Sequence, residues 1–225
     1  QLLMKLAFPM WTVPLVLLGL GFIAYGFLIP SWGFYWDDWA KTLVNHLYGY
    51  SGYWDYYAYD RPLSGWTHIV LLPTLGEEPL NWQIFTFTMR WISGVAMWYS
   101  LSILWPQAKR SLILAALLFM VYPVFRQQPI AVTFHQMWLQ YVLYFLSLGA
   151  MFLSIRKPHR YWHYMIPAVI MQFMINSITE DFIGVELLRP LFLWFIISQA
   201  EGSTSIRIRK TLRHYLPYAL MLSAY

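Results

Sequence analysis

The chain has 225 residues, of which 59% are hydrophobic, 20% are aromatic and only 11% are charged. A water-soluble domain usually carries about 25% charged residues, so this composition is typical of a protein that contacts lipid. The absence of cysteine excludes a disulfide scaffold and any cysteine-ligated metal. The net charge of +5 does not indicate a nucleic-acid partner, because the basic residues lie at the ends of apolar runs.

Long apolar runs follow one another along the chain and predict membrane-spanning helices, which need about 20 mostly apolar residues. Six runs have this character: Leu6–Ile29, Trp82–Trp105, Ser111–Val124, Phe134–Ile155, Tyr161–Ile178 and Phe182–Ser198. They are too continuous for the strands of a transmembrane barrel. The predicted fold class is therefore all-α: a polytopic transmembrane helical protein with about six spans plus the start of a seventh.

The ends of the chain indicate a piece of a longer protein. The first residue is Gln1 rather than Met, and the seventh apolar run, which begins near Tyr215, is cut off at Tyr225. We therefore expect residues 1–225 to form a single transmembrane domain, a fragment of a longer chain, with an outer loop at residues 30–81.

Charged residues sort into two sets of loops between these runs. Ten of the fifteen basic residues share one set: Lys5, Lys109, Arg110, Arg156, Lys157, Arg160, Arg207, Arg209, Lys210 and Arg213. The other set holds only Lys41, Arg61 and Arg126. Basic loops face the cytoplasm, which places the segment Pro30–Asn81 outside. Eight of the ten acidic residues fall on this outer side: Asp37, Asp38, Asp55, Asp60, Glu77, Glu78, Glu180 and Asp181.

The outer segment Pro30–Asn81 is rich in Trp and Tyr, which favour the boundary between membrane and water. Within it, Asp38–Tyr48 reads as a short amphipathic helix. Leu63–Leu75 is apolar but too short to span, which indicates an interfacial or re-entrant piece. We expect the segment to lie along the outer surface as short helices.

Two adjacent carboxylates, Asp37 and Asp38, open this segment. Adjacent acids repel each other, so the pair is stable if it binds a divalent cation or if one member stays protonated. The alternative is a helix N-cap, a position that Asp favours. One Asp could cap a helix while the other does chemistry.

Further polar groups fall on the same side. Arg61 presents a planar fork suited to phosphate or carboxylate, and Asp60 beside it could hold the fork in place; a surface turn is the simpler explanation. Glu180 and Asp181 could complete a site begun at Asp37 and Asp38, or could be solvated loop residues. His135 is a supporting polar candidate, although a lone His is more often structural.

Three charged residues lie within predicted spans, where charge is costly and usually functional. Glu186 and Arg189 are spaced by three and could pair on one helix face. Arg90 could meet a lipid phosphate, or extend its side chain towards the boundary.

This arrangement resembles the C-type glycosyltransferase superfamily, which includes the protein O-mannosyltransferases. The resemblance rests on Asp37-Asp38, which looks like the acidic motif of the first outer loop, on Asp60-Arg61-Pro62-Leu63, and on Thr179-Glu180-Asp181. It implies a hexosyl or pentosyl transferase of the cell envelope, multi-pass in a bacterial plasma membrane, with its active site on the non-cytoplasmic side.

The resemblance also implies roles for the site residues. The donor is a polyprenyl-phosphate-linked sugar, and the acceptor is a glycan, lipid or protein, with membrane lipid as a further partner. Asp37 and Asp38 are the catalytic candidates, with Asp37 as the base. Asp38 or Glu180 would hold a divalent cation such as Mg or Mn. Arg61 would face the donor phosphate, assisted by Arg189 or Arg90.

Two other functions compete with this one. A transporter or lipid flippase would use Arg90, Glu186 and Arg189 as a midplane site. A scaffold subunit would leave the outer acids as solvated surface.

Overall fold

A computed structural model describes residues 9–122, 127–200 and 202–223. Every secondary-structure element in this part of the chain is a helix, either α or 3-10. In order these are η2 (Met10–Thr12), α1 (Val13–Ala24), η3 (Gly26–Ser31), α2 (Asp37–Tyr48), α3 (Gly52–Tyr57), α4 (Trp66–Leu75), α5 (Pro79–Leu104), η4 (Pro106–Ala108), α6 (Lys109–Val121), α7 (Ala131–Arg156), η5 (Pro158–Arg160), α8 (Tyr161–Asn176), η6 (Glu180–Phe182), α9 (Ile183–Glu186), α10 (Arg189–Ser198) and α11 (Thr204–Ser223).

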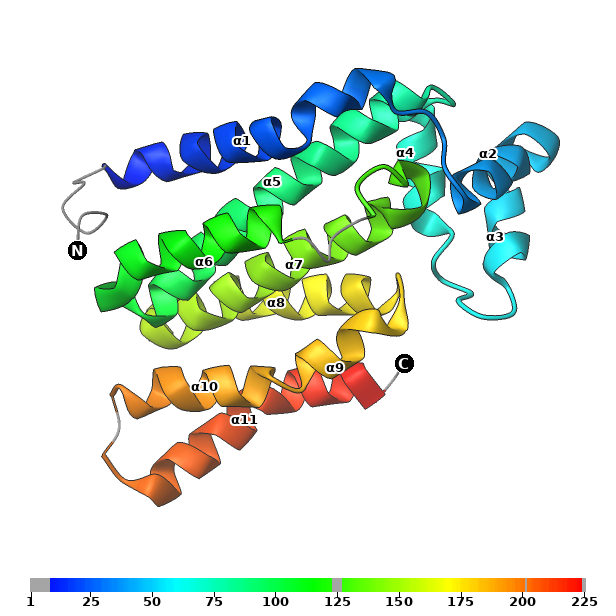
Figure 1. Ribbon diagram of the computed structural model, residues 1–225. Helices are drawn as coiled ribbons and strands as arrows, with labels where there is room; N and C mark the ends of the chain where they lie inside the picture. Colours follow the sequence, from blue (N-terminus) through cyan, green and yellow to red (C-terminus); the bar gives the residue numbers. More distant parts are fainter. Residues whose placement is uncertain (1–8, 123–126, 201, 224–225) are drawn as a thin grey trace.

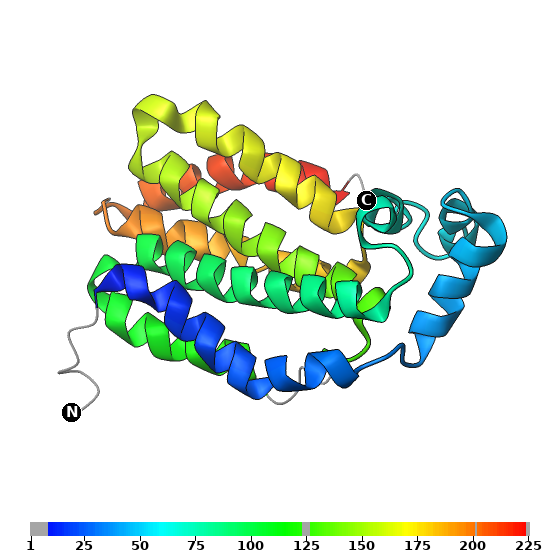
Figure 2. The same cartoon turned by 90° about the horizontal axis from the view of Figure 1, so that it is seen from above.

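The longer helices lie side by side as a bundle, with α2, α3 and α4 grouped at one end (Figure 1). The turns that follow α5, α7 and α10 gather at the opposite end (Figure 2). Five basic residues lie in or next to these turns, while Asp37 and Glu180 lie at the end near α2, so the two ends of the bundle differ in charge. The five are Lys109, Arg110, Arg156, Lys157 and Arg160.

Helix α7 forms the centre of the bundle and packs against α5 and α8. Its side chains Trp138 and Met151 are fully buried. Close approach to α5 depends on Gly149, where a Cβ atom would lie 2.6 Å from the Ser100 hydroxyl oxygen. That hydroxyl donates to the Phe145 carbonyl at 2.6 Å. Burying each large apolar side chain contributes roughly 1.5–3 kcal/mol to folding.

The prediction of six membrane spans is wrong. Among the described residues only α7 is long and apolar enough to cross a bilayer, and 61% of its most apolar stretch is buried against other helices. Helix α1 has 12 residues, α6 has 13 and α10 has 10, all short of the roughly 20 that a span needs. The multi-pass localisation in a bacterial plasma membrane, and the assignment of loops to an inner or outer side, are corrected with it.

The apolar runs break where the local sequence cannot continue a helix. The first run stops at Tyr25, whose backbone leaves the helical region (φ −134°), and a 3-10 turn containing Pro30 follows. The last run is divided between α9 and α10 just before Pro190. Helix α5 is long, but it buries polar side chains such as Gln83 and Arg90, which lowers its hydropathy. Leu6, Val124 and Arg126 lie outside the described residues.

Short helices do occupy the segment between α1 and α5. A helix was predicted over Asp38–Tyr48, and α2 runs over Asp37–Tyr48. The apolar piece predicted at Leu63–Leu75 contains α4, which packs on protein: its Leu72 lies in a buried cluster with Tyr53 and Trp82. This packing holds the segment at the end of the bundle, beside the first turn of α7.

Candidate functional site

A cleft of about 270 Å³ opens where α2, the end of α3, the first turn of α7 and the residues around η6 meet. Five charged side chains line it: Asp37, Lys41, Asp60, Arg61 and Asp181. Four of these five belong to the short polar motifs singled out in the sequence, although they come from positions more than 140 residues apart. The cleft therefore combines carboxylates with two cations in a small volume.

Asp37 begins α2 and is exposed to solvent within the cleft. The residue before it, Trp36, has φ 47° and ψ −121°, and it is the only described non-glycine residue with a positive φ. Such a conformation strains an L-residue with a bulky side chain and is characteristic of functional sites. The strained turn starts α2 at the point that places Asp37 in the cleft.

Asp38 has the opposite environment and is completely buried. Its Oδ1 accepts the backbone N–H of Thr133 at 2.8 Å, so the carboxylate caps the first turn of α7. Burial raises the pKa of the Asp38 carboxyl, against hydrogen bonds from Thr133 that lower it. The sequence analysis proposed that one of the adjacent acids caps a helix. Asp38 does so, but it caps α7 and not α2, the helix to which it belongs.

Lys41 is a cleft residue that the sequence analysis missed. Its side chain is buried, and its Nζ donates to the Thr133 hydroxyl at 3.1 Å. Burial lowers the pKa of the Lys41 ammonium, although the nearby Asp37 and Asp38 oppose this shift. The available signal was its spacing: four residues after Asp37, Lys41 lies on the same face of α2.

Arg61 is held in a bidentate ion pair with Glu180. Its Nε and Nη2 donate to the two carboxylate oxygens at 2.8 and 2.6 Å. Because of this hydrogen-bonded partner, the pKa of Glu180 falls to about 2. The sequence analysis gave Asp60 the role of holding the fork. Asp60 lies in the same cleft, but Glu180 makes the two hydrogen bonds.

The expected metal pair does not form. Asp38 is occupied by Thr133 and Glu180 by Arg61, so the two carboxylates do not face a common ion. In the described ranges no three His, Cys, Asp or Glu side chains form a group that could hold a metal. The residues present do not fit a Mg or Mn ion at this position.

His135 is buried below the cleft beside His68, with ring centroids 4.7 Å apart. His135 Nδ1 lies 2.7 Å from the Val132 carbonyl, which fits an N–H donated to that oxygen. The Nε2 atoms of both rings are buried without a hydrogen-bond partner. His68 was missed because it is 67 residues away in sequence, and it gives His135 the imidazole neighbour that the sequence did not reveal.

Arg90, Glu186 and Arg189 lie apart from the cleft, inside the bundle. Arg90 donates to the Tyr25 hydroxyl at 2.7 Å and the Met120 carbonyl at 2.9 Å. Arg189 makes two hydrogen bonds to Glu186, at 2.5 and 2.7 Å. These side chains are taken up by internal contacts, so they are not among the residues that could meet a donor phosphate in the cleft.

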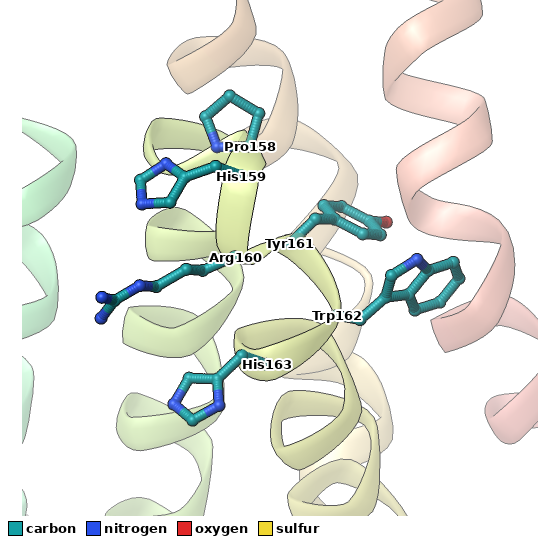
Figure 3. A pocket seen from close by; sticks show the side chains of 6 residues that line it. All are labelled: Pro158, His159, Arg160, Tyr161, Trp162 and His163. Carbon is teal, nitrogen blue, oxygen red and sulfur yellow. The ribbon is translucent and has the colours of Figure 1, made fainter.

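A second hollow lies at the other end of the bundle, around the turn between α7 and α8. Figure 3 shows His159, Arg160 and His163 pointing to one side of this turn, while Tyr161 and Trp162 point to the other. Its lining contains no carboxylate. It therefore lacks a general base of the kind that the cleft at α2 provides.

Comparison with known proteins gives no further assignment: no family model, curated protein or solved structure matches this chain.

Proposed function

We propose that this protein is a glycosyltransferase that moves a sugar from a polyprenyl-phosphate-linked donor to a hydroxyl of a glycan, lipid or protein acceptor. The observation that carries the proposal is the cleft, which brings the carboxylate of Asp37 together with the cations Lys41 and Arg61. Glycosyl transfer with a phosphate leaving group needs these two kinds of group side by side.

Asp37 acts as the general base. It accepts the proton of the acceptor hydroxyl, and the hydroxyl oxygen forms a bond to the anomeric carbon of the sugar. The bond between that carbon and the phosphate oxygen breaks, and its electron pair leaves with the polyprenyl phosphate. Asp37 suits this role because it is solvent-exposed within the cleft, whereas Asp38 is buried and hydrogen-bonded to Thr133.

Lys41 and Arg61 supply the positive charge for the leaving phosphate. A phosphate gains charge as its bond to the sugar breaks, so cations that are already in place stabilise the transition state. Arg61 offers a planar fork for two phosphate oxygens, and Lys41 offers a partly desolvated point charge. Both side chains line the cleft together with Thr133.

Exposed aromatic rings beside the cleft suit the polyprenyl chain of the donor. Trp36 precedes Asp37 and is 83% exposed, and Tyr59 precedes Asp60 and is fully exposed. Tyr56 contributes a third ring to the cleft lining itself. Apolar contact with such rings would suit an isoprenoid chain.

The test is transfer from a polyprenyl-phosphate sugar by the full-length protein. Asp37→Asn keeps the shape of the side chain but cannot take the proton, so we expect a loss of about 10²–10⁴-fold in rate. Asp55→Asn removes the same charge from an exposed position on α3 outside the cleft, and should retain activity. A wild-type rate of transfer by Asp37→Asn would show that Asp37 is not the base and would refute the proposed mechanism.

A further inference from the structure

One bidentate edge of the Arg61 guanidinium is occupied by Glu180 in this structure, so a phosphate that uses this edge must displace Glu180. The two hydrogen bonds of 2.8 and 2.6 Å use Nε and Nη2, which form one of the two bidentate edges of the guanidinium. A carboxylate and a phosphate present their oxygens to a guanidinium in the same bidentate way. Glu180 therefore occupies the position that two phosphate oxygens would take on this edge of Arg61.

From this geometry we infer that Glu180 competes with the donor phosphate for Arg61 and swings away when the donor binds, an inference that rests on the proposed function. Glu180 is then a positioning residue. It holds the guanidinium at the edge of the cleft before the donor arrives, and its displacement sets how tightly an anion must bind.

The surroundings of the pair permit such an exchange. The side chain of Glu180 is 51% exposed and that of Arg61 is 33% exposed, so water can solvate the carboxylate once it has moved away from Arg61. Exposed ion pairs are worth little net free energy, since water replaces each partner at low cost. By contrast, the ion pair between Glu186 and Arg189 is buried, with at most 1% exposure, and could not open in this way.

Displacement of Glu180 would also affect other residues of the cleft. Glu180 and Asp181 begin the short helix η6, and Asp181 lines the cleft while its Oδ2 accepts a hydrogen bond from Thr179 at 3.0 Å. The residue that leaves Arg61 is thus directly bonded to a residue of the cleft wall. Glu180 makes Arg61 selective for anions that can replace a carboxylate, which a phosphate can do and a neutral sugar cannot.

The test measures binding of farnesyl phosphate, a non-reacting probe, to the full chain by titration calorimetry. Glu180→Gln removes the competing charge and should bind the probe about fivefold more tightly at most, since an exposed ion pair contributes little net free energy. Glu180→Asp keeps the charge but is one methylene shorter, and should fall between wild type and Glu180→Gln. Glu78→Gln, an exposed acid outside the cleft, controls for the general loss of negative charge.

Arg61→Lys distinguishes a failure of the proposed donor site from a failure of the competition by Glu180. If the probe binds Arg61→Lys as well as wild type, the phosphate does not use Arg61, and the donor site of the proposed function fails. If Arg61→Lys weakens binding but Glu180→Gln leaves it unchanged or weakens it, the donor site stands and the competition by Glu180 is refuted. Tighter binding by Glu180→Gln and Glu78→Gln alike would also refute it, since any lost charge would then suffice.

Discussion

Neighbouring residues of a helix can face in different directions, and Asp37 and Asp38 depend on this. Successive residues of an α-helix are turned by about 100°, so one acid enters the cleft while the next enters the protein. Asp38 meets the Thr133 N–H, and Asp37 stays in water. The adjacent pair therefore consists of one structural carboxylate and one that is open to the cleft.

Removing the Asp38 carboxylate should destabilise the fold. Asp38→Ala leaves the half-buried Thr133 N–H without its acceptor and removes one of the two nearest negative charges from Lys41, so we expect a cost of about 1–3 kcal/mol in the free energy of unfolding. Urea unfolding followed by circular dichroism measures it. Asp60→Ala, at an exposed position, should cost much less. Equal costs for the two variants would contradict the capping role of Asp38.

At the scale of single residues, the sequence was informative about identity but not about partners. Asp37, Asp60, Arg61 and Asp181, all members of short polar motifs in the sequence, line one cleft. Their role in it stays a prediction. Lys41 was overlooked, since only the folded chain shows that its side chain is buried. Glu180 was assigned to a metal rather than to Arg61, because a pairing over 119 residues leaves no local pattern.

Among the helices, α4 docks on α7 through a pair of neutral imidazoles. Tyr53 stacks on His68 with ring centroids 4.5 Å apart, and His68 meets His135 edge to face. Burial lowers the pKa of His68 well below its usual value, and that of His135 to about 3. Both rings must therefore stay uncharged for α4 to remain docked.

This docking predicts acid sensitivity. In the unfolded chain both imidazoles take a proton near pH 6.5, whereas in the folded chain they do so only at much lower pH, so the unfolded state binds more protons between these values. Stability should be fully present above about pH 6.5 and decline as the pH falls below it. Urea midpoints measured from pH 5 to pH 8 test this. His68→Phe should reduce the slope, and an unchanged slope would exclude His68 as a source.

The long central helices could be predicted more closely than the short ones. The apolar run Phe134–Ile155 corresponds to α7 and Trp82–Trp105 to α5, because long uninterrupted runs leave little choice of structure. What the runs could not distinguish was burial against lipid from burial against protein. Ala168 of α8 and Met151 of α7 lie in the same buried cluster, where the apolar side chains cover one another.

For the molecule as a whole, the bundle and the group of short helices should differ in local stability. Helix α7 is covered on several sides, while α2 and α3 expose Trp39, Leu43 and Trp54 at the end of the bundle. We expect the slowest amide hydrogen exchange in the middle of α7 and α5, and faster exchange in α2, α3 and η6. Mass spectrometry of peptic fragments measures this. Uniform exchange over all helices would contradict it.

Thr133 links the helical bundle to the group of short helices, since its N–H donates to Asp38 and its hydroxyl accepts a hydrogen bond from Lys41. Few substitutions at this position would keep both contacts. Serine retains both groups, alanine retains only the N–H, and valine matches the shape of threonine while losing the hydroxyl. Insertions are constrained as well: one residue added within the first turn of α7 would rotate the rest of that helix by about 100° relative to Thr133. The turn at Gly49, between α2 and α3, could lengthen without disturbing either contact.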